Sequence, residues 1–254
     1  MTRRRLDAEL VRRGLARSRG QAAEMISGGA ITVGGVMNPK PASLVEAGTV
    51  IELVAEPPPF VGRGGLKLDG ALDAFDLDVQ GRRALDAGAS TGGFTDVLLQ
   101  RGAESVCAVD VGYGQLSSRL TNDPRVKVFD RTNIRNVGPD ELGATFDLIV
   151  ADLSFISLCT VAPALAALAE DGADLVLLVK PQFEVGRGDV GKGGIVRDSE
   201  ARAGAVRSVI ECLGRAGIGT QAVCASPVPG AKGNREFFVW CVRSAPTRDV
   251  EIPE

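Results

Sequence analysis

The stretch from Ala84 to Phe94, which reads ALDAGASTGGF, constrains the fold of this chain more than any other. A short apolar run ends at Asp86, a glycine-rich turn follows, and a helical pattern of apolar residues resumes at Phe94. This order is typical of a strand, a tight loop and the start of a helix, where unpaired backbone N–H groups and the helix dipole can hold a ligand. The sequence therefore predicts a ligand-binding loop in an α/β fold.

Several interpretations of this loop compete. A dinucleotide fingerprint needs Gly-x-Gly-x-x-Gly, and Ser90 occupies the middle glycine position. A nucleophile elbow needs Gly-x-Ser-x-Gly, which residues 88–92 match, but the chain contains no histidine, so the ordinary catalytic triad is excluded. The favoured interpretation is the first loop of a methyltransferase, which holds the amino-acid end of S-adenosylmethionine. A glycine turn without a ligand is the structural alternative.

Charge is unevenly distributed along the chain. Residues 1–67 contain 10 Lys and Arg against 6 Asp and Glu, whereas residues 68–254 contain 19 against 26. A basic end on an acidic body indicates a localised anionic partner. The Arg-rich start lacks the apolar run and cleavage site of a signal peptide. The uncharged stretch 153–169 contains Pro163 and three hydroxyl residues, so we interpret it as a loop and a buried helix and expect no membrane span.

The five cysteines are scattered at positions 107, 159, 212, 224 and 241. No Cys-x-x-Cys pair is present and there is no histidine to complete a zinc site. The spacing therefore favours neither a metal site nor a disulfide framework, and it indicates a cytoplasmic location.

The first sixty residues predict a small α+β module. Leu6 and Leu10 lie on one helical face that ends at Gly14, and Ser18 opens a second helix with Gln21 placed for a capping box. A hairpin at residues 31–36 and a strand at residues 50–54 follow. The order Arg-Leu-Asp, Arg-Ser-Arg-x-x-Ala and Ile-Thr-Val-Gly-Gly resembles the S4 RNA-binding domain over roughly residues 3–55.

Arginines gather in this module, at positions 3, 4, 5, 12, 13, 17 and 19. By the S4 resemblance, part of this set would contact phosphates of structured RNA, a contact that recognises shape and depends on salt. The residues expected to do so are Arg5, Arg17, Ser18, Arg19 and Lys40. The alternative is that the arginines form only a solvated face.

Residues 56–59 read Glu-Pro-Pro-Pro, which favours an extended spacer. We therefore divide the chain into an RNA-binding domain at residues 1–55, a linker at 56–63 and a larger domain at 64–254. In the larger domain strand and helix patterns alternate, as in a mainly parallel sheet with helices on both faces. Strands are predicted near 83–87, 105–110, 126–130, 146–152, 174–180, 220–224 and 236–242, and helices near 65–75, 93–101, 114–120, 158–169 and 199–216.

Carboxylates follow successive strands of this predicted sheet. Asp110 closes the second strand, where a carboxylate would take the ribose hydroxyls of the ligand, and Asp130 closes the third, placed for the adenine amino group. Each alone could be a helix cap or a solvated acid. Together with the loop they predict a cofactor site formed by Asp86, Gly88, Ala89, Ser90, Gly92, Gly93, Phe94, Asp110 and Asp130.

Four further ionisable residues stand where side chains could converge. Lys67 precedes the sheet, Asp152 ends the fourth strand, Lys180 ends the very apolar fifth strand, and Glu236 opens the last. Desolvation favours the neutral form of an amine, and a neutral amine can accept a proton from a sugar hydroxyl that attacks a methyl sulfonium. The two acids would orient the lysines and balance their charge. The structural alternative is a pair of salt bridges at the rim of the sheet.

This Lys-Asp-Lys-Glu order resembles the tetrad of FtsJ-like 2′-O-ribose methyltransferases. The fuller pattern of Leu85–Thr95, Asp110–Leu116, Asp152–Ser157 and Lys180–Glu184 resembles the TlyA family, which joins an S4 domain to an FtsJ-like domain. The resemblance implies an α/β fold with a class I, Rossmann-like seven-stranded methyltransferase sheet. It also implies that Lys67, Asp152, Lys180 and Glu236 carry the catalytic roles.

The same resemblance implies S-adenosylmethionine-dependent methylation of a cytidine 2′-hydroxyl in ribosomal RNA, with ribosomal subunits as partners. Longer members have a further C-terminal helix associated with modifying both subunits. The resemblance implies 23S rRNA as the substrate. Because this sequence ends soon after its last predicted strand, modification of 16S rRNA as well stays open. The glycine-rich segment 186–194 lacks the phosphate-loop order, and we interpret it as a substrate loop with Arg187 and Lys192 toward RNA. The alternatives are a non-catalytic ribosome-assembly factor and a membrane-active haemolysin.

Overall fold

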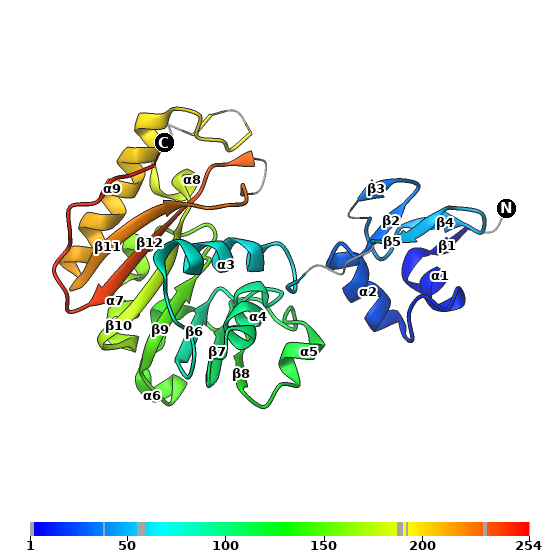
Figure 1. Ribbon diagram of the computed structural model, residues 1–254, viewed down its shortest axis with the longest axis horizontal. Coiled ribbons are helices and arrows are strands. Elements are labelled where there is room, and N and C mark those ends of the chain that lie inside the picture. Colours follow the sequence, from blue (N-terminus) through cyan, green and yellow to red (C-terminus); the bar gives the residue numbers. More distant parts are fainter. Residues whose placement is uncertain are drawn as a thin grey trace. The chain divides into compact units, whose positions relative to one another are not determined.

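The computed structural model describes residues 3–37, 39–54, 59–186, 190–191, 193–230 and 233–253. Most of the Pro-rich stretch of the expected linker, Arg187 and Lys192 lie outside the described residues. The chain divides into two compact units, Met1–Arg63 and Gly64–Glu254 (Figure 1).

The first unit packs two helices against short strands. Strand β1 (Arg3–Arg5) pairs with β4 (Leu44–Glu46), and β2 (Ile31–Val33) lies between β3 (Val36–Met37) and β5 (Ile51–Leu53). Helix α1 is Leu6–Arg12 and helix α2 is Arg19–Ser27. Apolar residues from both helices and from β2 and β4 meet in one core, because their spacing places them on facing sides: Leu6, Leu10, Ala22, Ile26, Ile31 and Val45.

Of the two hydrogen bonds of the capping box expected at the start of α2, one is confirmed. The hydroxyl of Ser18 accepts a hydrogen bond from the backbone N–H of Gln21 at 3.1 Å, which satisfies one of the free donors of the first turn. The reciprocal bond of a capping box is absent from this end of α2. The side-chain oxygen of Gln21 instead accepts from the backbone N–H of Arg17 at 2.7 Å.

The second unit is built on a seven-stranded sheet in the order β11-β12-β10-β9-β6-β7-β8 (Figure 1). The five strands from β10 to β8 run parallel, and β12 is antiparallel to both β10 and β11. The expectation of a mainly parallel α/β sheet of the Rossmann-like methyltransferase type is confirmed. The strands are β6 (Arg83–Ala87), β7 (Ser105–Val109), β8 (Val126–Phe129), β9 (Phe146–Ala151), β10 (Ala169–Val179), β11 (Ile218–Ala225) and β12 (Phe237–Arg243).

Helices cover the sheet on two sides. One core joins α7 (Leu158–Leu168) and α9 (Ser199–Arg215) to alternate residues of the strands, among them Leu177 and Phe237. On the opposite side, α3 (Gly64–Phe75) packs with α4 (Gly93–Gln100), and the Phe94 ring of α4 lies 6.1 Å from the Phe238 ring. The remaining short helices are α5 (Ser118–Thr121), η1 (Ile134–Asn136), α6 (Pro139–Leu142) and α8 (Pro181–Glu184).

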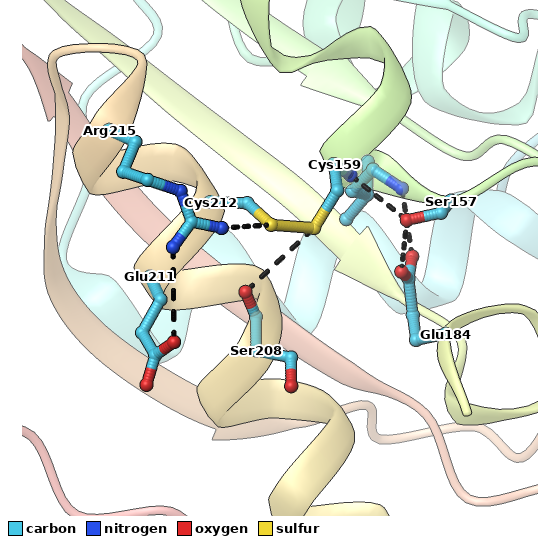
Figure 2. Close-up of a disulfide and its surroundings, with 8 residues drawn as sticks. Ser157, Cys159, Glu184, Ser208, Glu211, Cys212 and Arg215 are labelled. Carbon is cyan, nitrogen blue, oxygen red and sulfur yellow. Dashed lines mark hydrogen bonds and ion pairs between the residues drawn. A yellow bond between two sulfur atoms is a disulfide. The ribbon is translucent and has the colours of Figure 1, made fainter. Parts of the chain in front are cut away.

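The expectation against disulfides is wrong at one place. Cys159 of α7 and Cys212 of α9 are joined, with their Cα atoms 5.3 Å apart (Figure 2). The two residues are 53 positions apart, so their spacing carried no signal, but α7 and α9 pack together on one face of the sheet. The other three cysteines are free.

Within the part of the chain that the structure describes, no helix combines the length and the apolar character needed to cross a membrane. The same residues contain no group of three or more potential metal ligands.

Candidate active site

The glycine loop follows β6 and turns sharply at the carboxyl edge of the sheet. Gly88 has φ 88°, and a Cβ added there would lie 2.6 Å from the carbonyl oxygen of Asp152. Gly92 has φ 100° and forms the N-cap of α4, where a Cβ would overlap the side chain of Leu120. Both positions therefore require glycine, because backbone and neighbour leave no room for a side chain.

Asp86 lies beneath this loop and is fully buried. Its Oδ2 accepts a hydrogen bond from the hydroxyl of Thr95 at 2.7 Å, whereas its Oδ1 has no hydrogen-bond partner among the described residues. Burial raises the pKa of Asp86 to about 7, and the nearby carboxylates of Asp152 and Asp110 contribute to the rise. The site thus contains a desolvated acid with a spare acceptor atom.

The strand-end acids organise the neighbouring loops. Asp110 accepts from the backbone N–H of Ser90 at 2.8 Å and of Gly112 at 2.6 Å. Asp130 accepts from the backbone N–H of Gly114 at 2.9 Å. Asp110 lines a cavity at the carboxyl edge of the sheet, and Asp130 is not among the residues that line this cavity.

A cavity of about 500 Å³ opens above the loop at the carboxyl ends of β6, β7 and β9. Of the expected cofactor residues, Gly88, Ser90 and Asp110 line it, and so does Asp152 of the expected tetrad. The other lining residues are Val109, Val111, Gln115, Thr132, Asn133, Ile134, Leu153, Ser154, Phe155 and Ile156. The Phe94 ring, by contrast, is buried in the contact with Phe238.

The four expected catalytic residues form two ion pairs. The Lys67 Nζ lies 2.6 Å from Glu236 Oε2, and the Lys180 Nζ lies 2.5 Å from Asp152 Oδ1. Lys67, Lys180 and Glu236 are each exposed by less than a tenth of their surface. Each amine is therefore held by a carboxylate in a place largely withdrawn from solvent.

The sheet register brings these pairs together. Val179 of β10 pairs with Phe237 of β12, so Lys180, the next residue along, lies beside Glu236. Leu177 of β10 pairs with Ala151 of β9, which places Asp152 on the other side of the same strand end. The backbone N–H of Asp152 donates to the carbonyl of Ala87, directly before the glycine loop. The ends of three adjacent strands thus bring Asp152, Lys180 and Glu236 together, and Lys67 joins them from α3. Of these four residues only Asp152 lines the cavity.

Sequence reasoning missed one partner of this group. The Lys180 Nζ also donates to the Ser154 hydroxyl at 2.9 Å, and Ser154 lines the cavity. Ser154 lies two residues after Asp152 in the turn that follows β9, but its position 26 residues before Lys180 gave no signal of the contact. Phe155, the next residue, has φ 63° and is 90% exposed, so this turn presents an aromatic ring to solvent.

In the first unit, the expected RNA contacts divide into two kinds. Arg5 and Arg19 both bond the buried carboxylate of Asp7, at 2.8 and 3.1 Å, and this contact holds the pKa of Asp7 well below its usual range. Ser18 caps α2. Arg17 and Lys40 are exposed. Arg5 and Arg19 thus have a structural role besides any contact with RNA.

The family comparisons cover both units. The FtsJ-like methyltransferase family matches residues 60–243, and the S4 domain matches residues 4–51. A Mycobacterium tuberculosis protein described as 16S/23S rRNA (cytidine-2′-O)-methyltransferase TlyA is 56% identical over 94% of this chain and 89% of its own length. Hemolysin A of Brachyspira hyodysenteriae is 38% identical over 92% of this chain and 98% of its own length.

Solved structures agree with this assignment. A Streptococcus thermophilus protein, provisionally named a hemolysin, superposes with a TM-score of 0.77 at 38% identity, covering 98% of this chain and 92% of that one. The N-methyltransferase NodS from Bradyrhizobium japonicum in complex with S-adenosyl-L-homocysteine has a TM-score of 0.51 at 16% identity, over 70% of this chain and 86% of that one. The latter shows the fold alone.

The fold, with the glycine loop that follows β6, and the family match define an S-adenosylmethionine-dependent methyltransferase. The chain belongs to the FtsJ-like methyltransferase family and carries an S4 domain, and the resemblance to TlyA proteins is confirmed.

The residues of the cavity fit S-adenosylmethionine. The cofactor carries an ammonium and a sulfonium. The carboxylates of Asp110 and Asp152 line the cavity, and the buried carboxylate of Asp86 lies near enough to interact with both. Gly88 leaves room for close approach to the backbone, and Asp86 Oδ1 offers an acceptor that the described residues do not use. The chemistry of this donor set matches a cationic ligand.

Proposed function

We propose that this protein methylates the 2′-hydroxyl of a cytidine in ribosomal RNA. The single observation that carries the proposal is the pairing of Lys180 with Asp152, which lines the cavity, together with the pairing of Lys67 with Glu236, the residue opposite Lys180 in the sheet. The relatives named after their substrates support the RNA assignment: the M. tuberculosis relative is named for 16S and 23S rRNA, and a Campylobacter jejuni relative at 31% identity for 23S rRNA. Because 23S rRNA is common to both, we propose 23S rRNA as the substrate.

Each member of the tetrad has a distinct role in this proposal. Lys180, as a neutral amine, is the general base: the O–H bond of the 2′-hydroxyl breaks and its proton passes to the amine. The oxygen would form a bond to the methyl carbon as the bond from that carbon to sulfur breaks, and sulfur would keep the electron pair. Asp152 fixes that amine at 2.5 Å. Lys67 and Glu236 hold the ribose beside it and balance the charge of the site. Bound S-adenosylmethionine supplies a methyl group that is electrophilic because it is carried by a sulfonium.

The cofactor would lie along the loop from Asp86 to Phe94, with Asp110 toward its ribose and Asp130 toward its adenine. Gly88, Ser90 and Asp110 support this placement because they line the cavity. Asp130 would act from behind the 112–114 loop, to which it is hydrogen-bonded.

Residues 1–55 would dock the RNA, and residues 56–63 would link the two domains. Positively charged side chains of α1, α2 and the following loop supply the phosphate contacts: Arg5, Arg17, Arg19 and Lys40, with Ser18 at the start of α2. Ribosomal subunits are the proposed partners, and the cytoplasm is the proposed location, because these partners are there.

The proposal is tested by mass spectrometry of nucleosides from separately purified 16S and 23S rRNA, in a host without an endogenous enzyme of this kind. The intact protein should produce 2′-O-methylcytidine in 23S rRNA, and Lys180→Ala should not. Lys127→Ala is a matched control, because the Lys127 amine bonds the carbonyl of Leu142 outside the cavity. A modification confined to 16S rRNA would overturn the substrate assignment. No heat on titrating S-adenosylmethionine would favour a non-catalytic assembly factor instead.

A further inference from the structure

Two segments that follow adjacent strands of the sheet contact each other through several consecutive side chains. The first is Asp152–Ser157, after β9, and the second is Lys180–Glu184, after β10. The Lys180 amine contacts Asp152 at 2.5 Å and Ser154 at 2.9 Å. One residue further on, the ring of Phe155 lies 5.1 Å from that of Phe183.

The far end of the two segments is joined by Glu184. Its Oε2 accepts from the hydroxyl of Ser157 at 2.6 Å, and its Oε1 accepts from the backbone N–H of Leu158 at 2.8 Å (Figure 2). Glu184 therefore satisfies a free donor at the N-terminus of α7, and the disulfide of Cys159 ties the same helical turn to α9. The turn that carries Ser154 is thus fixed at both ends.

Serine and aspartate offer different bonds to an amine. A carboxylate only accepts hydrogen bonds, so Asp152 interacts best with the ammonium form of Lys180. A hydroxyl accepts from an ammonium and donates to a neutral amine, so Ser154 can stay bonded before and after proton transfer. Ser154 lines the cavity proposed to hold the cofactor, so this second contact lies on the cavity side of the amine.

We propose that Ser154 is a positioning residue that orients the Lys180 amine in both of its protonation states. The inference rests on the proposed function, in which Lys180 accepts the proton of the 2′-hydroxyl. Ser154 acts through Lys180 and not on the RNA or the cofactor.

Besides Asp152, which contacts the Lys180 amine, charged groups come near Lys180 from two other elements. Asp152 follows β9, Glu236 lies across from Lys180 before β12, and Lys67 of α3 is bound to Glu236. Glu184, on the segment of Lys180 itself, is occupied with the start of α7. Ser154 adds a neutral acceptor to this set, and a bond to an ammonium is stronger than one to a neutral amine. Removing it therefore disfavours the ammonium form.

The test compares Ser154→Ala and Ser154→Thr in the full-length protein with 23S rRNA as substrate. For Ser154→Ala we expect kcat to fall about tenfold, KM for S-adenosylmethionine to stay within twofold, and the acid limb of the kcat profile to move to lower pH by about 0.5 unit. Ser154→Thr keeps the hydroxyl and should restore both the rate and the position of the limb.

Ser157→Ala is the matched control, because it loosens the same segment at Glu184 without touching Lys180. It should leave the acid limb at the wild-type pH. The inference is overturned if Ser154→Ala behaves as wild type, if its limb does not move, if Ser154→Thr fails to restore it, or if Ser157→Ala moves it equally. Lys180→Ala, measured alongside, separates a failure of the inference about Ser154 from a failure of the proposed function. Retained methylation in Lys180→Ala overturns the proposed function itself.

Discussion

The carbonyl oxygen of Asp152 lies 2.6 Å from the position that a Cβ on Gly88 would occupy. This contact links the glycine loop to Lys180, the proposed general base, because the same residue bonds the Lys180 amine through its side chain. Asp152 therefore contacts both the glycine loop and Lys180, and a larger residue at Gly88 would push against it.

Gly88→Ala should accordingly impair cofactor binding and stability together. The added methyl group meets backbone, which cannot move aside, and φ 88° is unfavourable for alanine. We expect the free energy of unfolding to fall by about 2 to 4 kcal/mol and the affinity for S-adenosylmethionine to fall at least tenfold. Urea unfolding and calorimetry measure the two effects.

Gly81→Ala is the control for this change. Gly81 has φ 72°, but nothing lies within 4 Å of the added Cβ, so only the backbone cost of about 1 kcal/mol remains. Equal losses in the two variants would show that the contact with Asp152 has no special weight.

Asp86 should make stability depend on pH. Because burial raises its pKa in the folded protein to about 7, the unfolded chain releases this proton at lower pH than the folded one. Between about pH 4 and pH 7, Asp86 is ionised in the unfolded chain but keeps its proton in the folded protein. The free energy of unfolding therefore falls progressively as pH rises through this range. Asp86→Asn should remove this part of the pH dependence, as measured by urea unfolding at pH 5 and pH 8.

The same acid should couple cofactor binding to proton release. A cationic ligand favours the carboxylate form, so binding of S-adenosylmethionine should strengthen as pH rises from 6 to 8 and should release protons into the buffer. Calorimetry in buffers of different ionisation enthalpy detects that release. An identical pH dependence in Asp86→Asn would contradict the assignment.

The disulfide should stabilise the second unit without serving the reaction. Cys159 and Cys212 close a loop of 53 positions, for which the chain-entropy estimate is about 4 kcal/mol. Cys212→Ser or reduction by a dithiol should lower the urea midpoint by a corresponding amount. Cys224→Ser, which changes a free cysteine, should not reproduce the effect. A midpoint that is the same with and without dithiol would show that the bond adds no stability.

The first unit should bind RNA mainly through phosphates. Arg17→Ala should weaken RNA binding and reduce the slope of log affinity against log salt by about 1. Arg125→Ala is the control, because its guanidinium bonds Asp123 in the other unit. A salt slope that Arg17→Ala leaves unchanged would remove Arg17 from the RNA contacts.

Local pattern predicted most of this fold. The seven strands of the second unit follow from apolar runs bounded by turn residues, and six of them lie within two residues of their expected bounds. The fifth strand, β10, begins at Ala169, five residues before its expected start at residue 174, because its acidic first part pairs irregularly with β9. Helices α6 and α8 escaped notice because four residues are too few to show a helical period.

The site was predictable where residues stand at strand ends and not where contacts join distant segments. Register alone places Lys180 beside Glu236. The contact between Ser154 and Lys180 and the bond between Cys159 and Cys212 depend on how turns and helices pack, and their spacing in the chain carries no signal of it. For Arg5 and Arg19, the sequence shows the charge, but it does not show that both guanidinium groups bond the same carboxylate, that of Asp7.

The central claim is that the Lys180 amine accepts the proton of the ribose hydroxyl. The most direct measurement is the single-turnover rate of methyl transfer to 23S rRNA by Lys180→Ala, with its affinity for S-adenosylmethionine measured by calorimetry on the same sample. The account predicts a rate at least 100-fold below wild type with the affinity within about twofold. A rate within a few-fold of wild type would contradict it.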